Sequence, residues 1–93
     1  MNKTLLINRI DPQDKSNEKE KIFFLIGGME LPSVDAQLLD ILHKSGLVGE
    51  NDIIYKYNGI ELNITVSDIP RIITLLSLND IDIYSVFKKY DPY

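Results

Sequence analysis

The fold is decided by the stretch from Ile60 to Phe87, IELNITVSDIPRIITLLSLNDIDIYSVF, which predicts a strand, a helix and a second strand. The stretch from Lys21 to Val66 predicts the same order, and the two halves share the strand Ile60–Val66. A chain built in this way has the order βαββαβ. We therefore expect a ferredoxin-like α+β sandwich, with a four-stranded antiparallel sheet and two helices on one of its faces.

The helix of the second half carries signals at both ends. Ser67 is the expected N-cap, Asp68 lies beside it, and Pro70 is tolerated there because the early amides lack intrahelical acceptors. Asn79 is the expected stop. The buried stripe should contain Ile69, Ile72, Ile73 and Leu76, and the exposed side Arg71, Thr74 and Ser77. In the last strand, Ile81, Ile83 and Ser85 alternate with Asp82, Tyr84 and Val86.

The residues from Asp52 to Val66 predict a β-hairpin whose turn is Asn58-Gly59. Asn-Gly at the centre of a two-residue turn adopts the positive φ angles of a type I′ turn. The expected register places Lys56 opposite Glu61, Tyr57 opposite Ile60, Tyr55 opposite Leu62 and Ile53 opposite Ile64. It gathers six residues on one face of the hairpin: Ile53, Tyr55, Tyr57, Ile60, Leu62 and Ile64.

The first half begins with an apolar run, Lys21–Ile26, bounded by Gly27 and Gly28, which is typical of a central strand. Ser33 is the expected N-cap of a helix that runs to Ser45, and Gly46 follows where a left-handed residue ends a helix. The stripe predicted to be buried contains Val34, Leu38, Ile41 and Leu42.

The chain divides into residues 1–20 and a domain of residues 21–93. Thr4–Ile10 is apolar enough for an extra edge strand, but it also suits the end of an element that lies upstream. Asp11–Glu20 has no apolar residue and many charges, so we expect a linker or a long loop.

Composition narrows the classes of function. The 93 residues suffice for one domain, and a net charge of −4 gives neither nucleic acid nor an anionic membrane a counter-charge. Without cysteine there is no disulfide frame, thiolate nucleophile or Cys-based zinc site. No apolar stretch approaches the ~20 residues of a membrane helix. We expect a soluble chain, and a cytoplasmic location suits it.

Residues that often carry catalysis do not form a catalytic pattern here. Gly27-Gly28 lacks the spacing of a Walker or dinucleotide motif, so a bend at the end of a strand is expected. His43, the only histidine, is expected as a solvated residue at the end of a helix. None of the serines lies in a Gly-x-Ser-x-Gly elbow. We predict no catalytic residue, no cofactor-binding residue and no metal ligand, hence no enzyme in this chain alone.

Acidic and aromatic residues likewise match no known pattern of a metal-binding or RNA-binding site. Asp68, Asp80, Asp82 and Asp91 lack the spacing of a calcium loop, and Asp80 and Asp82 are expected to face water. Five tyrosines suggest stacking on bases, but Lys21–Gly28 does not match the motif of RNA-binding domains, so packing in the core or at an interface is favoured. These tyrosines are Tyr55, Tyr57, Tyr84, Tyr90 and Tyr93.

The stretch Ile60–Val86 resembles the accessory region that follows the ATP-binding domain in bacterial ABC-2 type exporters of drugs and lantibiotics. The resemblance rests on Asp68 and Pro70 at the start of the helix, and on Asp82 and Val86 in the last strand. It implies a C-terminal accessory or regulatory domain of a transporter ATPase, on the inner face of the membrane. The implied partner is the parent ATPase domain or a second copy. The family's nucleotide motifs are absent from these 93 residues, so the resemblance brings them no ATP hydrolysis.

A second class of function remains open. Free-standing ACT-like domains have the same order of elements and bind small amino acids near a glycine turn after the first strand, and Gly27-Gly28 stands in the corresponding place. The alternative expectation is therefore a ligand-sensing or protein-interaction domain.

Overall fold

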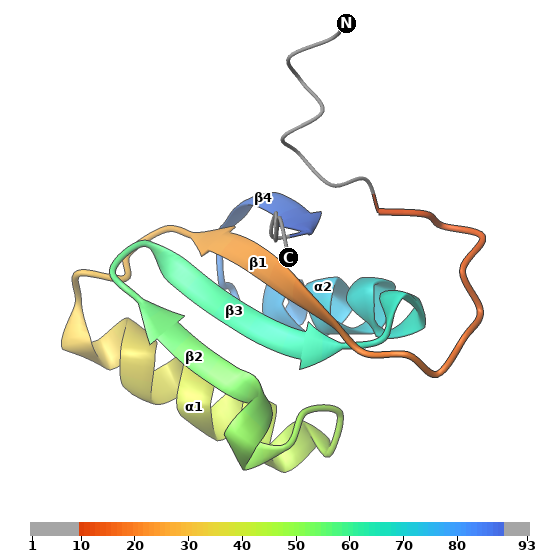
Figure 1. Ribbon diagram of the computed structural model, residues 1–93. Coiled ribbons are helices and arrows are strands. Elements are labelled where there is room, and N and C mark those ends of the chain that lie inside the picture. The colour runs from red at the N-terminus through yellow and green to blue at the C-terminus, as the bar shows by residue number, and fades with distance from the viewer. Residues whose placement is uncertain (1–9, 89–93) are drawn as a thin grey trace, which may run out of the picture.

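The computed structural model describes residues 10–88, which form the predicted βαββαβ chain (Figure 1). The strands and helices are β1 (Glu20–Ile26), α1 (Pro32–Ser45), β2 (Ile53–Lys56), β3 (Gly59–Ile64), α2 (Ile69–Leu78) and β4 (Ile83–Lys88). The strands form one antiparallel sheet in the order β2-β3-β1-β4, with β1 at its centre as expected. The ferredoxin-like α+β architecture is confirmed.

The core lies between one face of the sheet and the two helices. Ile22 and Phe24 of β1 are fully buried, and their neighbours in sequence point to the opposite face. The residues that meet them come from β3 (Ile60, Leu62, Ile64), from α1 (Leu38, Ile41, Leu42) and from α2 (Ile69, Ile72, Leu76). Both predicted helical stripes are confirmed, with Val34 and Ile73 half-buried at their margins.

Both predicted serine caps are wrong. Leu31 is the N-cap of α1, which starts at Pro32, and the amide of Val34 donates to the Leu31 carbonyl at 3.0 Å. A 3₁₀ turn, Val66–Asp68, precedes α2 and contains Ser67. The Asp68 amide donates to the Thr65 carbonyl at 3.1 Å. A turn closed by a backbone hydrogen bond thus precedes or opens each helix, and within the described residues no side chain caps either N-terminus.

The C-terminal ends of both helices agree with the sequence-based predictions. Gly46 ends α1 with a φ of 71°, in the left-handed region. Asn79 caps α2, and Asp80 after it has a φ of 62°. The amide of Asp80 donates to Ser77, and that of Ile81 donates to Leu76, which is a Schellman motif.

The hairpin register differs from the predicted one by two residues. The structure pairs Lys56 with Gly59 and Tyr55 with Ile60, so Tyr57 and Asn58 form the turn. Neither Asn58 nor Gly59 has a positive φ. Gly59 instead lies within β3, and a Cβ atom there would lie 2.0 Å from the Phe24 carbonyl oxygen. Close strand packing, and not turn conformation, requires this glycine, and the predicted Lys56–Glu61 pair is absent from the described register.

The last strand contains an irregularity that its alternation did not indicate. Leu25 pairs with Ser85 and Ile26 pairs with Ile83, so Tyr84 has no opposite residue. Because of this bulge, Ile83 and Val86 both lie on the core side, although the simple alternation separated them. Ile81 is buried before the strand begins.

The start of the chain is described from Ile10 onward. The predicted strand Thr4–Ile10 therefore lies outside the described residues, apart from Ile10 itself. From residue 11 to 19 the chain forms neither helix nor strand. Within the described residues, neither helix has the length and apolar character needed to cross a bilayer.

Candidate functional site

The glycine pair after β1 forms a bend whose outer side is covered. Gly28 has a φ of 79°, and the Gly27 amide donates to the Asp82 carbonyl at 3.0 Å. A Cβ atom at Gly27 would lie 2.7 Å from the ring of Tyr84. The predicted bend is present, and the Tyr84 ring lies against it.

The candidate titratable residues are dispersed. His43 lies in the last turn of α1, and its Nε2 is 4.0 Å from a Glu50 carboxylate oxygen. Asp68 pairs with Arg71 at 3.7 Å. In residues 10–88 no three His, Cys, Asp or Glu side chains come together as a group able to hold a metal ion, and Asp91 lies outside that range.

The tyrosines contribute to the surface more than to the core. Tyr57 is 90% exposed at the hairpin turn, and Tyr84 is 71% exposed at the bulge of β4. Tyr55 is partly covered, because it lies on the helix side of β2. Tyr57 and Tyr84 therefore do not pack in the core, and packing at an interface stays a prediction for both. Tyr90 and Tyr93 lie outside the described residues.

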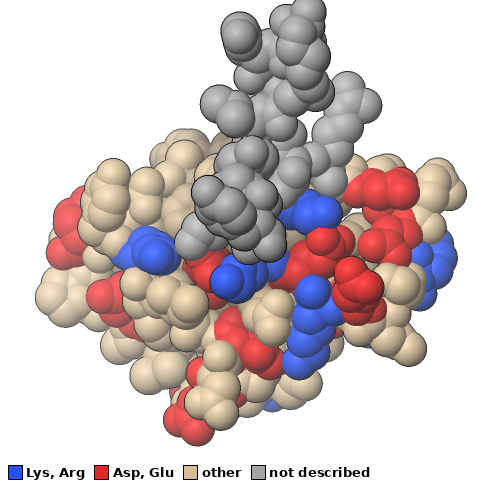
Figure 2. Space-filling model, viewed as in Figure 1, with Lys and Arg blue, Asp and Glu red and all other residues tan. Residues whose placement is uncertain are grey.

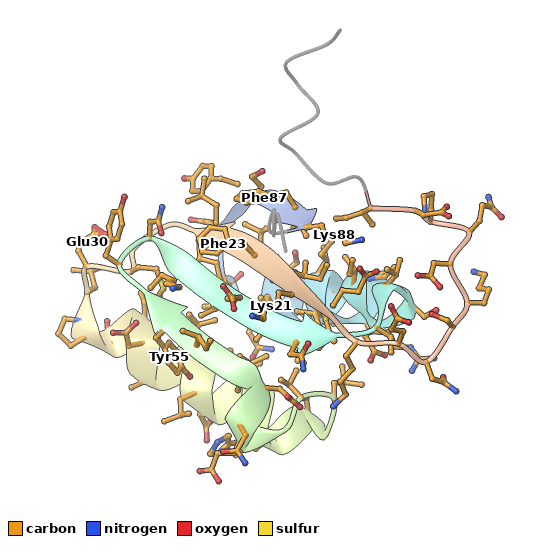
Figure 3. The ribbon with its side chains drawn as sticks, viewed as in Figure 1. Lys21, Phe23, Glu30, Tyr55, Phe87 and Lys88 are labelled. Carbon is orange, nitrogen blue, oxygen red and sulfur yellow. The ribbon has the colours of Figure 1, made fainter. Side chains whose placement is uncertain are left out.

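The face of the sheet away from the helices carries an aromatic pair (Figure 3). The ring centroids of Phe23 on β1 and Phe87 on β4 lie 5.2 Å apart. Glu61 of β3 pairs with Phe23 and is only 3% exposed. These three residues line a hollow of about 290 Å³ together with Lys56, Tyr57 and Asn58. RNA-binding domains of this fold place aromatic residues on both central strands. Here the β3 residue that pairs with Phe23 is Glu61, which is acidic and not aromatic. The absence of a nucleic-acid partner stays a prediction.

A second surface is more apolar. Among residues 10–88, eight large hydrophobic side chains are exposed, and five of them belong to α1, β2 and the short segments next to these two elements. We call these five the β2–α1 edge: Leu31, Leu39, Ile54, Tyr55 and Tyr57. Leu31 and Ile54 are each about half exposed, at 51% and 48%. Scattered apolar residues are ordinary on protein surfaces, but a gathered set marks a binding surface.

The orientation of α1 explains this gathering. Gln37 donates from its side chain to the Asn79 carbonyl at 3.1 Å, so that side of α1 faces the end of α2. Leu31, Asp35 and Leu39 are spaced by four residues and share the opposite flank. Figure 1 shows α1 running along the β2 side of the sheet, and Figure 3 shows Tyr55 extending from β2 toward it.

Electrostatics place Asp35 beside Tyr55. Burial raises the pKa of the Tyr55 phenol, and the negative charge of Asp35 raises it further. The flank of α1 that carries Leu31 and Leu39 therefore lies next to the strand. The β2–α1 edge thus has Tyr55 and the Leu31–Leu39 flank of α1 on its helix side and Ile54 on its open side.

The helix side of this edge is acidic. Glu30 precedes Leu31, and Asp35 lies between Leu31 and Leu39. Within residues 10–88 neither carboxylate has a cation within 4.0 Å, whereas Asp40 on the other flank of α1 pairs with Lys44 at 3.1 Å. Figure 2 shows acidic and basic side chains interspersed over the face in view. Among the described residues, Asp35 is thus a carboxylate without a cationic partner next to β2.

The sequence contained part of this signal. Leu31, Asp35 and Leu39 follow the helical spacing of four, next to the stripe predicted to be buried. The position of β2 at an edge of the sheet agrees with the ferredoxin-like fold expected from the sequence, but the flank of α1 that lies beside it depends on tertiary packing. Comparison with protein-family models, with curated proteins and with solved structures finds no match for this chain.

Proposed function

We propose that this chain is a protein-binding accessory domain that docks on a larger partner through the β2–α1 edge. The observation that carries this proposal is the gathering of Leu31, Leu39, Ile54, Tyr55 and Tyr57 on one edge of the molecule. Burying exposed apolar surface contributes roughly 25 cal/mol per Å², and aromatic residues are enriched where proteins bind each other. This edge therefore offers more to a partner than the dispersed titratable groups offer to a substrate.

In the setting that we propose, this chain is the C-terminal accessory domain of the ATP-binding protein of a bacterial ABC-2 type exporter, and the partner is the parent ATPase domain. This part of the proposal is supported by the resemblance of Ile60–Val86 to the accessory region of such ATPases, and by the βαββαβ order. In this setting the domain lies in the cytoplasm at the inner face of the membrane. It binds the ATPase and biases the dimerisation of the motor domains, which couples two sites through a change in binding free energy. The ACT-like alternative stays a prediction.

Photo-crosslinking tests both parts of the proposal. The photoreactive amino acid p-benzoylphenylalanine replaces Leu39 on the edge or, as a matched control, Leu78, a leucine on α2 that is exposed away from the edge. In the native host we expect an adduct from position 39, with the exporter ATP-binding subunit identified by mass spectrometry. The same adducts from both positions, or adducts only from position 78, would contradict docking through this edge. A different protein captured from position 39 would contradict the exporter setting alone.

A functional test follows from the same setting. Deletion of residues 21–87 removes the whole sheet and both helices. We expect the deletion to change export of the substrate or the basal ATPase rate of the partner. Unchanged transport and an unchanged ATPase rate would show that the domain has no regulatory role there.

A further inference from the structure

The strand β2 offers backbone hydrogen-bonding groups at the side of the sheet. Among the described strands it pairs only with β3, so its outer side faces away from the sheet. The other outer strand, β4, begins with the bulge at Tyr84, which interrupts regular pairing. Natural proteins often protect edges with such irregularities. The register of β2 is regular from Ile53 to Lys56, so β2 is the edge better suited to accept another strand.

Side chains flank that edge on both faces of the sheet. Tyr55 lies on the helix side and pairs with the buried Ile60, whereas Ile54 lies on the open side and pairs with Glu61. A strand added beside β2 would alternate its side chains in the same way. Its helix-side residues would contact Tyr55 and Leu39, and its open-side residues would contact Ile54.

Charge distinguishes the two sides. Asp35 lies on the helix side beside Tyr55, and within the described residues it has no cationic partner. A lysine or arginine on the helix side of an added strand could reach this carboxylate, with its aliphatic stem lying over Tyr55. The open side favours an apolar residue beside Ile54.

We propose, on the basis of the protein-binding role above, that β2 accepts an extended segment of the partner by strand addition, with Lys or Arg on the α1 side alternating with apolar residues on the open side. The added strand extends the sheet to five strands and covers the β2–α1 edge. Main-chain hydrogen bonds supply affinity in this mode of recognition, and the side chains supply specificity. Asp35 selects the basic residue.

A second copy of this chain fits the same edge poorly. Antiparallel pairing of two β2 strands about a two-fold axis through Tyr55 would place residues Tyr55 and Asp35 of both copies on the same side. Two uncompensated carboxylates would then approach each other, which disfavours the dimer. The segment that pairs with β2 therefore comes from a partner with the opposite charge.

Peptide titration tests this inference. The probe is acetyl-VKVKVKV-amide, which presents lysine on one side of an extended strand and valine on the other, and its control is acetyl-VEVEVEV-amide. Isothermal titration calorimetry with the full chain gives the dissociation constants, and ¹⁵N-labelled chain locates the binding site by chemical-shift changes. We expect the lysine peptide to bind, with the largest changes in Ile53–Lys56 and around Asp35, and the glutamate peptide to bind at least about five-fold more weakly.

Two further comparisons separate strand addition from general attraction. Two further peptides are N-methylated on alternate amides, so that each has the hydrogen-bond donors of one edge blocked. The peptide whose blocked edge faces β2 cannot donate to it and should bind about ten-fold more weakly than the parent peptide. The variant Asp35→Lys should weaken binding about five-fold. The control Asp82→Lys changes the net charge by the same amount at a site far from β2, and it should change the affinity less than two-fold. Circular dichroism verifies that both variants are folded.

Several results would overturn the inference. One is the absence of binding at 1 mM lysine peptide. Another is equal affinity of both N-methylated peptides and the parent peptide, and a third is a set of chemical-shift changes centred on Phe23 and Phe87. Concentration-dependent dimerisation through β2, seen by light scattering and shift changes, would also overturn it. If position 39 still crosslinks to a partner while the peptide experiments give one of these results, strand addition is wrong and the protein-binding role stands. If the crosslink is lost while the lysine peptide binds at β2 as expected, the proposed docking partner is wrong and strand addition stands.

Discussion

Gly59 of β3 lies directly against the backbone of Phe24 on β1, so closely that a Cβ atom at position 59 would lie 2.0 Å from the Phe24 carbonyl oxygen. The ring of Phe23 lies 2.8 Å from the same point. This contact holds the end of the hairpin against the central strand, and the Asn58 carbonyl next to it accepts a hydrogen bond from the Ile26 amide at 3.0 Å. The hairpin position that carries Tyr57 is therefore set by a backbone contact.

Gly59→Ala should destabilise the chain by about 2–4 kcal/mol, because the contact is with backbone and cannot be relieved by a side-chain rotation. Gly46→Ala is the matched control. Gly46 has a positive φ but nothing within 4 Å of a Cβ, so its substitution should cost only about 1 kcal/mol of conformational strain. Urea unfolding measures both values. Equal losses at the two positions would refute the steric account.

Asp80→Gly should stabilise the chain by about 0.5–1 kcal/mol. Asp80 adopts a φ of 62° in the Schellman motif that ends α2, a conformation that glycine adopts without strain. Asp82→Gly, two residues later at an exposed position without positive φ, should instead be neutral or slightly destabilising. Thermal and urea unfolding compare the two variants. A loss of stability in Asp80→Gly equal to that in Asp82→Gly would contradict the strain account.

The phenol of Tyr55 should ionise above its usual pKa of 10.0, because of burial first and the Asp35 charge second. The folded chain thus holds this proton more tightly than the unfolded chain does. The stability that follows is fully present below pH 10 and is lost as the pH rises through the folded pKa. NMR of ¹³C-labelled tyrosine measures the pKa. Asp35→Asn should lower it partway toward the usual value, whereas Asp40→Asn on the other flank should not; equal effects would contradict the position of Asp35.

The carboxyl group of Asp52 should titrate below its usual pKa of 3.8. Its largest stabilising contact is with Lys19, whose Nζ lies 3.0 Å from Oδ2, and the Asn63 amide donates to Oδ1 at 3.3 Å. The folded state therefore gains stability above pH 3.8 and loses it as the pH falls through the folded pKa.

Lys19→Ala should raise the Asp52 pKa toward 3.8 without reaching it, because the Asn63 contact persists. Lys44→Ala, which breaks the Lys44–Asp40 pair on α1, is the control and should leave Asp52 unchanged. NMR titration of the side-chain carboxyl measures both. An Asp52 pKa unaffected by the loss of Lys19 would show that this ion pair does not form in solution.

The sequence predicted the elements and the core, and failed where tertiary contacts decide local geometry. Periodicity located Leu38 and Leu76 in the core because burial on a helix follows its period, whereas the apolar run Lys21–Ile26 indicated a central strand without separating its buried residues from the others. Gly59 is ambiguous in sequence, because glycine suits both a turn with positive φ and a close backbone contact. A single sequence does not distinguish the two.

The candidate site was less predictable than the fold. Exposure of Leu39 and Ile54 depends on β2 being at the edge of the sheet, and strand order is set by long-range pairing. Serine is a common N-cap residue, yet neither Ser33 nor Ser67 caps its helix. Turns closed by backbone hydrogen bonds at the helix starts make Leu31 and Asp68 the N-caps instead. The bulge at Tyr84 likewise arises from pairing with β1 and has no local signature.

The β2–α1 edge is the proposed binding surface, and a matched pair of leucine variants tests whether it binds the partner. Leu39→Glu places a charge on the edge, and Leu78→Glu places the same charge on an exposed leucine of α2. Calorimetric titration with the partner crosslinked from position 39 measures both affinities. We predict that Leu39→Glu weakens binding at least about ten-fold and that Leu78→Glu changes it less than two-fold. Equal affinities of the two variants would contradict the claim.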